Sequence, residues 1–169
     1  MKLRTHYVFS TGLLTLVDTL FINFYYSLVL SAFVAVIANT LIDKLGHREV
    51  LTRRGYVPAR TPLTHTLYRS IAWGLISIIP FLLLLLLLTK TRYYYIIPLA
   101  IDGIIVGPSH MLLDAFTERG VYVKRKGKWV RFALAHYKYD NPTVNSLAIL
   151  AGFLLLLIAY YIAHFYYYS

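Results

Sequence analysis

The chain has 169 residues, of which 59% are hydrophobic, and it carries a formal net charge of +10 and no cysteine. Soluble domains are about 45–50% apolar, so this composition excludes a soluble globular protein, and the length indicates one domain over residues 1–169. The lack of cysteine excludes disulfides and thiolate metal ligands. The positive charge first indicates membrane topology, and nucleic acid is not an expected partner.

Hydrophobic stretches in chain order predict an all-α fold, a polytopic α-helical integral membrane protein with about five transmembrane helices. A helix needs about 20 residues to cross the hydrocarbon core. The predicted spans lie near residues 8–20, 25–41, 67–88, 96–116 and 144–161. The first stretch is the shortest and carries Asp18. We therefore predict it as a tilted span, a re-entrant segment or a buried half-length helix.

The loops between these stretches differ strongly in charge. With five spans, residues 43–61 and 118–141 fall on one side together with the N-terminus. The basic residues of the first loop are Lys44, Arg48, Arg53, Arg54 and Arg60, and the second loop carries seven more between Arg119 and Lys138. The opposite side receives only Lys90 and Arg92. The positive-inside rule therefore predicts a cytoplasmic N-terminus and an outside C-terminus in the cell membrane.

The second basic loop also carries a strand pattern. Two short β-prone runs within residues 120–132 flank a turn at Lys126-Gly127. Such a pair of runs around a glycine-containing turn is typical of a β-hairpin. We expect a small cytoplasmic hairpin in the loop after the fourth helix.

Four of the six histidines are predicted to gather at the cytoplasmic face, because each stands at the inner end of a different element. They are His6, His47, His65 and His110. Asp43 precedes His47 by four residues, and Asp114 follows His110 by four. This spacing stacks side chains on one helix face, about 5–6 Å apart. Imidazole and carboxylate ligands without sulfur favour zinc, manganese or iron.

Simpler interpretations of these residues stay open. A single histidine near the interface is more often a capping or snorkelling residue than a ligand, and an isolated Asp/His pair is usually structural. Ionisable groups near a membrane span are costly, however, and tend to be functional. Asp18 and Asp102 are interpreted as buried hydrogen-bonding groups, with a polar path through the bilayer as the alternative.

The same residues carry a resemblance to a known family. The segments THYVFSTG (5–12), LIDKLGH (41–47), THT (64–66) and GPSHMLLDAFTERGV (107–121) occur in this order. They resemble the YdjM-like family of LexA-binding, inner-membrane proteins predicted to be metal-dependent hydrolases, and most of all an archaeal branch described as a domain of unknown function. The resemblance implies a metal-ligand signature, which here comprises His6, Asp43, His47, His65, His110 and Asp114. One segment departs from the family pattern. The family typically has Pro-Asp-x-Asp-His, whereas this chain has Asp43-Lys-Leu-Gly-His47.

We therefore expect a membrane-embedded metal-dependent hydrolase that acts at the cytoplasmic interface. Its substrate would be a phosphoester or ester of a lipid or lipid-linked molecule, and its metal zinc, with manganese or iron as alternatives. Asp43 or Asp114 would serve as ligand or general base, with Thr64 in a supporting catalytic role. The alternative is a non-enzymatic membrane-complex subunit or anchor whose basic loops bind a protein partner or anionic lipid. A metal or proton transporter ranks third.

Overall fold

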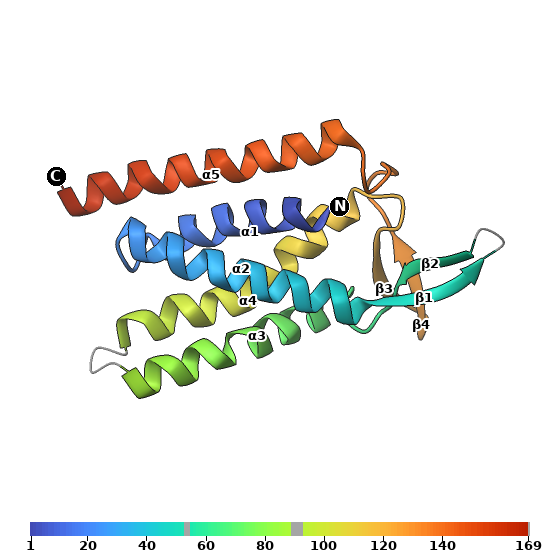
Figure 1. Cartoon of the computed structure of the whole chain (residues 1–169), viewed down its shortest axis with the longest axis horizontal. Coiled ribbons are helices and arrows are strands. Elements are labelled where there is room, and N and C mark those ends of the chain that lie inside the picture. The colour runs from blue at the N-terminus through green and yellow to red at the C-terminus, as the bar shows by residue number, and fades with distance from the viewer. Residues whose placement is uncertain (53–54, 89–92, 169) are drawn as a thin grey trace.

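The computed structural model describes residues 1–52, 55–88 and 93–168. The helices in this part of the chain are α1 (Leu3–Asp18), α2 (Phe24–Gly46), α3 (Leu67–Leu88), α4 (Tyr93–Ala115) and α5 (Pro142–Tyr168). Two antiparallel hairpins join them, β1 (His47–Thr52) with β2 (Gly55–Arg60) and β3 (Val121–Arg125) with β4 (Lys128–Phe132). All four strands and the N-terminus lie at one end of the helix bundle, and the C-terminus lies at the other (Figure 1).

Four of these helices are long and apolar enough to cross a membrane. They span Phe24–Gly46, Leu67–Leu87, Tyr94–Ala115 and Pro142–Phe165. The predicted helical membrane protein is thus confirmed in outline, with four candidate spans. The remaining helix, α1, has 16 residues and packs against α2, α4 and α5. Its length and position fit the predicted alternative of a buried half-length helix.

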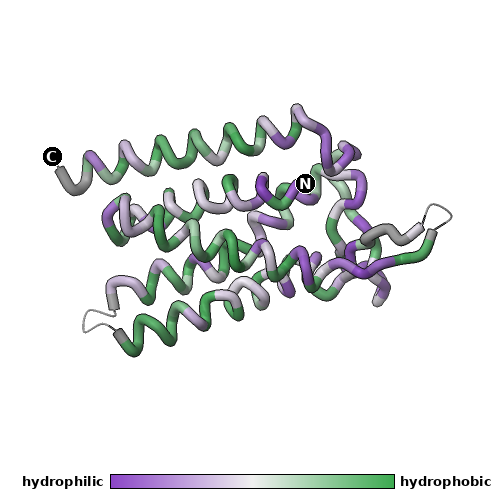
Figure 2. Tube along the Cα trace, viewed as in Figure 1, coloured by the Kyte–Doolittle hydropathy of each residue, from purple (hydrophilic) through white to green (hydrophobic). Residues whose placement is uncertain are grey.

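The distribution of apolar side chains matches a bundle surrounded by lipid. A buried cluster that includes Leu14, Val34 and Leu99 joins α1, α2 and α4. Other large apolar side chains face outward, such as Leu87 at 82% and Phe165 at 76% exposure. Hydrophobic residues cover the helices, while hydrophilic residues concentrate at the hairpin end (Figure 2). Exposed apolar surface on helices of this length is typical of helices that face lipid tails.

The predicted hairpin after the fourth helix is confirmed. β3 and β4 pair from Val121↔Phe132 to Arg125↔Lys128, around the expected turn. Lys126 and Gly127 both have positive φ, at 47° and 79°. Two-residue hairpin turns need this left-handed backbone, which glycine adopts without steric cost.

The first basic loop also forms a hairpin, although the sequence analysis predicted a hairpin only for the second basic loop. Helix α2 continues to Gly46 and β1 begins at the next residue. Because β2 pairs back along β1 with His47 opposite Arg60, the chain returns to the end of α2. Thr61 N–H then donates to the carbonyl oxygen of Gly46 at 2.8 Å. Of the basic residues used for the topology prediction, Arg53, Arg54, Lys90 and Arg92 lie outside the described residues.

Helices α1 and α5 approach each other at Gly12 and Gly152. A Cβ atom on Gly12 would collide with the carbonyl oxygen of Gly152, and a Cβ atom on Gly152 would meet the backbone of Val8. Only glycine permits so close a contact between two helix backbones. This contact holds α1, which carries His6, inside the bundle.

Candidate metal centre

The centre is formed by residues that are distant in sequence and fully or almost fully buried. His6 comes from α1, His65 lies two residues before the start of α3, and α4 supplies His110 and Asp114. Two groups have ligand atoms that all lie within 4.8 Å of one another. One group is His6, His110 and Asp114, and the other is Asp43, His65 and His110. Five of the six predicted ligands therefore belong to these groups.

Asp114 lies at the middle of the centre. Its Oδ1 atom is 3.3 Å from His6 Nε2. Its Oδ2 atom is 3.3 Å from His110 Nε2 and 3.5 Å from His65 Nε2. The rings of His6 and His110 are stacked with centroids 3.8 Å apart. Three imidazoles thus direct the same ring nitrogen toward one carboxylate.

The tautomer of His110 is determined by a chain of polar side chains. His110 Nδ1 lies 2.8 Å from Asn39 Oδ1. The amide nitrogen of Asn39 donates to Ser10 Oγ at 3.1 Å and to the Ala35 carbonyl at 2.7 Å. Because both amide hydrogens are used, the oxygen of Asn39 faces the imidazole and accepts from Nδ1–H. His110 Nε2 therefore carries a lone pair, as a metal ligand requires.

The tautomer of His65 is determined in a similar way. The hydroxyl of Thr64 donates to the Ile42 carbonyl at 2.8 Å, so its oxygen is left to accept from His65 Nδ1 at 2.8 Å. Burial lowers the pKa of His65 to about 4, so the ring is neutral at pH 7. Thr64, predicted as catalytic, is fully buried and lies behind the imidazole. Its position is that of an orienting residue.

Several buried polar atoms of the centre have no hydrogen-bond partner among the described residues. They are Nε2 of His65, both ring nitrogens of His6, Nε2 of His110 and Oδ2 of Asp114. A buried polar atom without a partner costs about 1–3 kcal/mol, and native structures contain few of them. Their concentration around one point indicates that the residues fit a cation bound between them.

Asp43 and His47 lie at the rim of the centre and are partly exposed. His47 Nδ1 is 2.6 Å from the Asp43 carbonyl oxygen and 3.3 Å from its carboxylate. The rings of His47 and His65 meet edge to face at 5.3 Å. His47 is the one predicted ligand that belongs to neither group of converging atoms found in the described chain.

Two positive groups approach the opposite side of the Asp114 carboxylate. Arg60 Nη2 and the α-amino group of Met1 each lie 2.6 Å from Oδ1. Arg60 is 6% exposed, and its Nη1 also donates to Thr117 Oγ1 and to the Gly120 carbonyl at 2.9 Å. Oδ1 of Asp114 is thus shared by Arg60, the Met1 amino group and His6, whereas Oδ2 faces His65 and His110.

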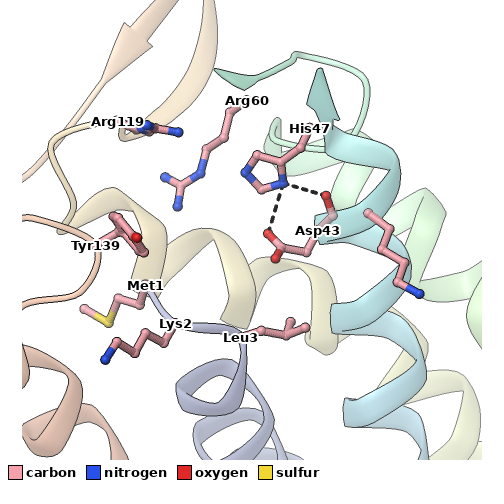
Figure 3. A pocket seen from close by; sticks show the side chains of 9 residues that line it. Met1, Lys2, Leu3, Asp43, His47, Arg60, Arg119 and Tyr139 are labelled. Carbon is pink, nitrogen blue, oxygen red and sulfur yellow. Dashed lines mark hydrogen bonds and ion pairs between the residues drawn. The ribbon is translucent and has the colours of Figure 1, made fainter. Parts of the chain in front are cut away.

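An open pocket of about 710 Å³ adjoins the centre at its rim, where Asp43, His47 and Arg60 line it. Its wall combines apolar atoms with positive side chains, as Figure 3 shows. The residues around it include Lys2, Asp43, His47, Arg60, Arg119 and Tyr139. The pocket is at the hairpin end of the bundle, because these residues come from the start of α1, the end of α2, the β1–β2 hairpin and the connection between α4 and α5. A ligand could therefore reach the rim of the centre from the polar end of the protein.

Two important residues were missed or left undecided by sequence reasoning. Asn39 was overlooked, although an amide four residues before Asp43 in an apolar span is a detectable signal. Arg60 was considered as one of the basic residues of the first loop that predict the topology. Its contact with Asp114 depends on the β1–β2 hairpin, which the sequence prediction lacked.

The fold and the centre together define a helical, multi-pass membrane protein with a buried His/Asp group that could hold a metal ion. Its family follows from comparison with known proteins: the chain belongs to the family described as protein of unknown function (DUF1286), whose model matches residues 1–113. The match includes His6, His65 and His110 and ends one residue before Asp114. Neither a curated protein nor a solved structure matches the chain.

Proposed function

We propose that this protein is a membrane-embedded, metal-dependent hydrolase acting on a phosphoester or ester of a lipid or lipid-linked substrate. The observation that carries the proposal is the set of buried Nε2 atoms of His6, His65 and His110, which have no hydrogen-bond partner in the described chain and surround the carboxylate of Asp114. Imidazole with carboxylate suits zinc, and also manganese or iron. A divalent ion bound there would polarise the scissile bond and activate a water molecule.

The residues of the chain divide into ligands and supporting groups in this proposal. The three imidazoles and Asp114 hold the ion, while Asn39 and Thr64 orient His110 and His65 through their Nδ1 atoms. Asp43 belongs to the second converging group and also lines the open pocket. It is therefore either a further ligand or the general base that receives a proton from the attacking water.

The position of the pocket supports a substrate that resides in the membrane. It opens among the polar segments at one end of the bundle, beside helices whose outer surfaces are apolar. A bound headgroup could reach the centre while its hydrocarbon part stays in the bilayer. The positive-inside rule makes this end cytoplasmic and leaves the C-terminus outside.

Metal content tests the proposal directly. The protein should be purified in an uncharged detergent, and its bound metal measured by elemental analysis. We expect about one zinc, manganese or iron ion per chain in the wild type and near zero in a His65→Ala, His110→Ala double variant. His136→Ala is the matched control, because His136 is exposed in the loop before α5. Metal-free wild-type protein, or full hydrolytic activity in the double variant, would refute the proposal.

A non-enzymatic subunit or anchor remains the second candidate. It is favoured by the β3–β4 hairpin, whose basic residues Lys124, Arg125, Lys128 and Arg131 are exposed. Such a surface suits an acidic protein partner or anionic lipid. Isolation of a stable complex that contains no metal would support this candidate over the hydrolase.

A further inference from the structure

Arg60 differs from the other basic residues at this end of the bundle in being buried and rigidly held. Its Nη1 and Nη2 atoms contact Thr117, Gly120 and Asp114. The carbonyl oxygen of Arg60 also accepts from the Tyr122 hydroxyl at 2.9 Å, so the strand that carries it is bound to β3. The guanidinium is therefore fixed before any ligand arrives, and binding loses little side-chain entropy.

One donor of this fixed guanidinium is unused. Arg60 Nε is buried and has no hydrogen-bond partner among the described residues. Arg60 nevertheless lines the open pocket, with its guanidinium extending into it in Figure 3. A buried N–H with no acceptor is costly. An acceptor supplied by a ligand in the pocket would remove this cost.

Positive charge surrounds the same part of the pocket. Arg119 lies beside Arg60 and extends toward it from the segment after α4 (Figure 3). Lys2 and Lys44 line the pocket as well, and Asp43 is the one acidic residue among its described lining. Guanidinium groups match the geometry of phosphate oxygens and bind them through paired, charge-assisted hydrogen bonds.

We propose that Arg60 and Arg119 form a phosphate-binding subsite in this pocket, which makes the substrate of the centre a phosphoester rather than a carboxylic ester. This inference rests on the proposed function. Arg60 contacts Oδ1 of Asp114, whereas His65 and His110 face Oδ2 of the same carboxylate. A phosphate held by the two arginines would thus stand next to the metal ligands, with its remaining substituent directed along the apolar wall formed by Met1 and Leu3.

Binding of defined phosphate compounds to the zinc-loaded full chain in an uncharged detergent tests the subsite. Inorganic phosphate reports the phosphate contact alone, and dihexanoyl phosphatidic acid adds two short acyl chains. We expect both compounds to bind the wild type, and Arg119→Gln to weaken each by about tenfold, as expected for one charge-assisted contact. Tighter binding of the lipid than of inorganic phosphate would identify the source as a lipid headgroup, and equal binding a free phosphate compound.

Two further variants separate the subsite from charge and folding effects. Arg4→Gln makes the same change of net charge at an exposed position of α1 outside the pocket lining and should bind phosphate like the wild type. Arg60→Lys keeps a positive charge beside Asp114 but removes the Nε donor, and it should also weaken phosphate binding several-fold. Elemental analysis of each variant shows whether the metal content has changed.

The outcomes distinguish this inference from the proposed function. Zinc at one ion per chain, with unchanged phosphate affinity in both Arg119→Gln and Arg60→Lys, would overturn the subsite and leave the metal centre intact. Equal weakening by Arg4→Gln would also overturn it, because the effect would then be nonspecific. Phosphate binding that depends on Arg119 in a protein without metal would support the subsite while the hydrolase proposal fails.

Discussion

Asn39 in α2 accepts a hydrogen bond from Nδ1 of His110 in α4, at 2.8 Å, in the fully buried interior of the bundle. The amide can play this role only in one orientation, because its nitrogen donates to Ser10 and to the Ala35 carbonyl. The hydroxyl of Ser10 lies 2.7 Å from that of Ser109, which donates onward to the Val106 carbonyl. The polar interior of three helices therefore determines which ring nitrogen of His110 faces the centre.

Replacing Asn39 with alanine should weaken zinc binding by about 10–100-fold, the usual effect of losing a partner that orients a ligand. His110 would then lose the acceptor that holds its tautomer and ring orientation. Competition with a chromophoric chelator measures the affinity. Asn23→Ala is the control, since Asn23 caps the distant start of α2; an equal loss in both variants would contradict this role of Asn39.

Replacing Gly46 with alanine should displace the loop that carries His65. A Cβ atom there would collide with Thr64 Oγ1 and with the His65 ring. Inserting a methyl group into a packed site costs about 1–3 kcal/mol. We expect a lower melting temperature and at least tenfold weaker zinc binding, measured on the same sample. Leu45→Ala, at an exposed neighbouring position, should change neither quantity, and an unaltered Gly46→Ala variant would show that the loop adapts freely.

Removal of bound metal should destabilise the wild-type protein. A ligand at 100 times its Kd stabilises the folded state by about 2.7 kcal/mol, and a chain of this size gains roughly 2–4 °C per kcal/mol. A chelator should therefore lower the melting temperature by about 5–10 °C. Fluorescence of Trp73 and Trp129 can follow the transition. The His65→Ala, His110→Ala variant should show no shift, and a similar shift in that variant would mean that the chelator acts elsewhere.

Replacing Asp102 with asparagine should stabilise the protein. Both carboxylate oxygens of Asp102 are buried without a hydrogen-bond partner in the described chain, and Asp102 interacts electrostatically with Asp18 of α1. Asparagine keeps the shape and adds an N–H that can donate to Asp18. The expected gain is about 1–3 kcal/mol, the cost of an unsatisfied buried polar group. Thermal unfolding in detergent measures it, and a destabilised variant would show that the carboxylate itself is required.

The direction of the chain across the membrane can be tested with single cysteines, because the protein has none of its own. Lys126→Cys lies at the turn of the β3–β4 hairpin, and Leu20→Cys lies at an exposed position in the turn between α1 and α2, outside the candidate spans. A membrane-impermeant thiol reagent should label Leu20→Cys in intact cells and Lys126→Cys only in inverted vesicles. The reverse pattern would contradict a cytoplasmic centre.

Some features of the molecule were determined by its amino-acid sequence alone. Apolar stretches of membrane-spanning length and clustered basic loops predicted the helical class and one polar end. The turn residues Lys126 and Gly127 predicted one hairpin. These properties are local, because hydropathy, charge and backbone preference act within a few residues. The positions of the histidines at the ends of different elements are likewise visible in the sequence.

The tertiary structure decided the arrangement of the centre. It directs His6, His65 and His110 toward Asp114, leaves His47 at the rim, and brings Asn39 behind His110. It also places Arg60 against Asp114 through the β1–β2 hairpin, a segment that the sequence predicted only as a loop. The physical reason is that the rotation of each helix and the return of each hairpin depend on packing between distant segments, such as Gly12 against Gly152.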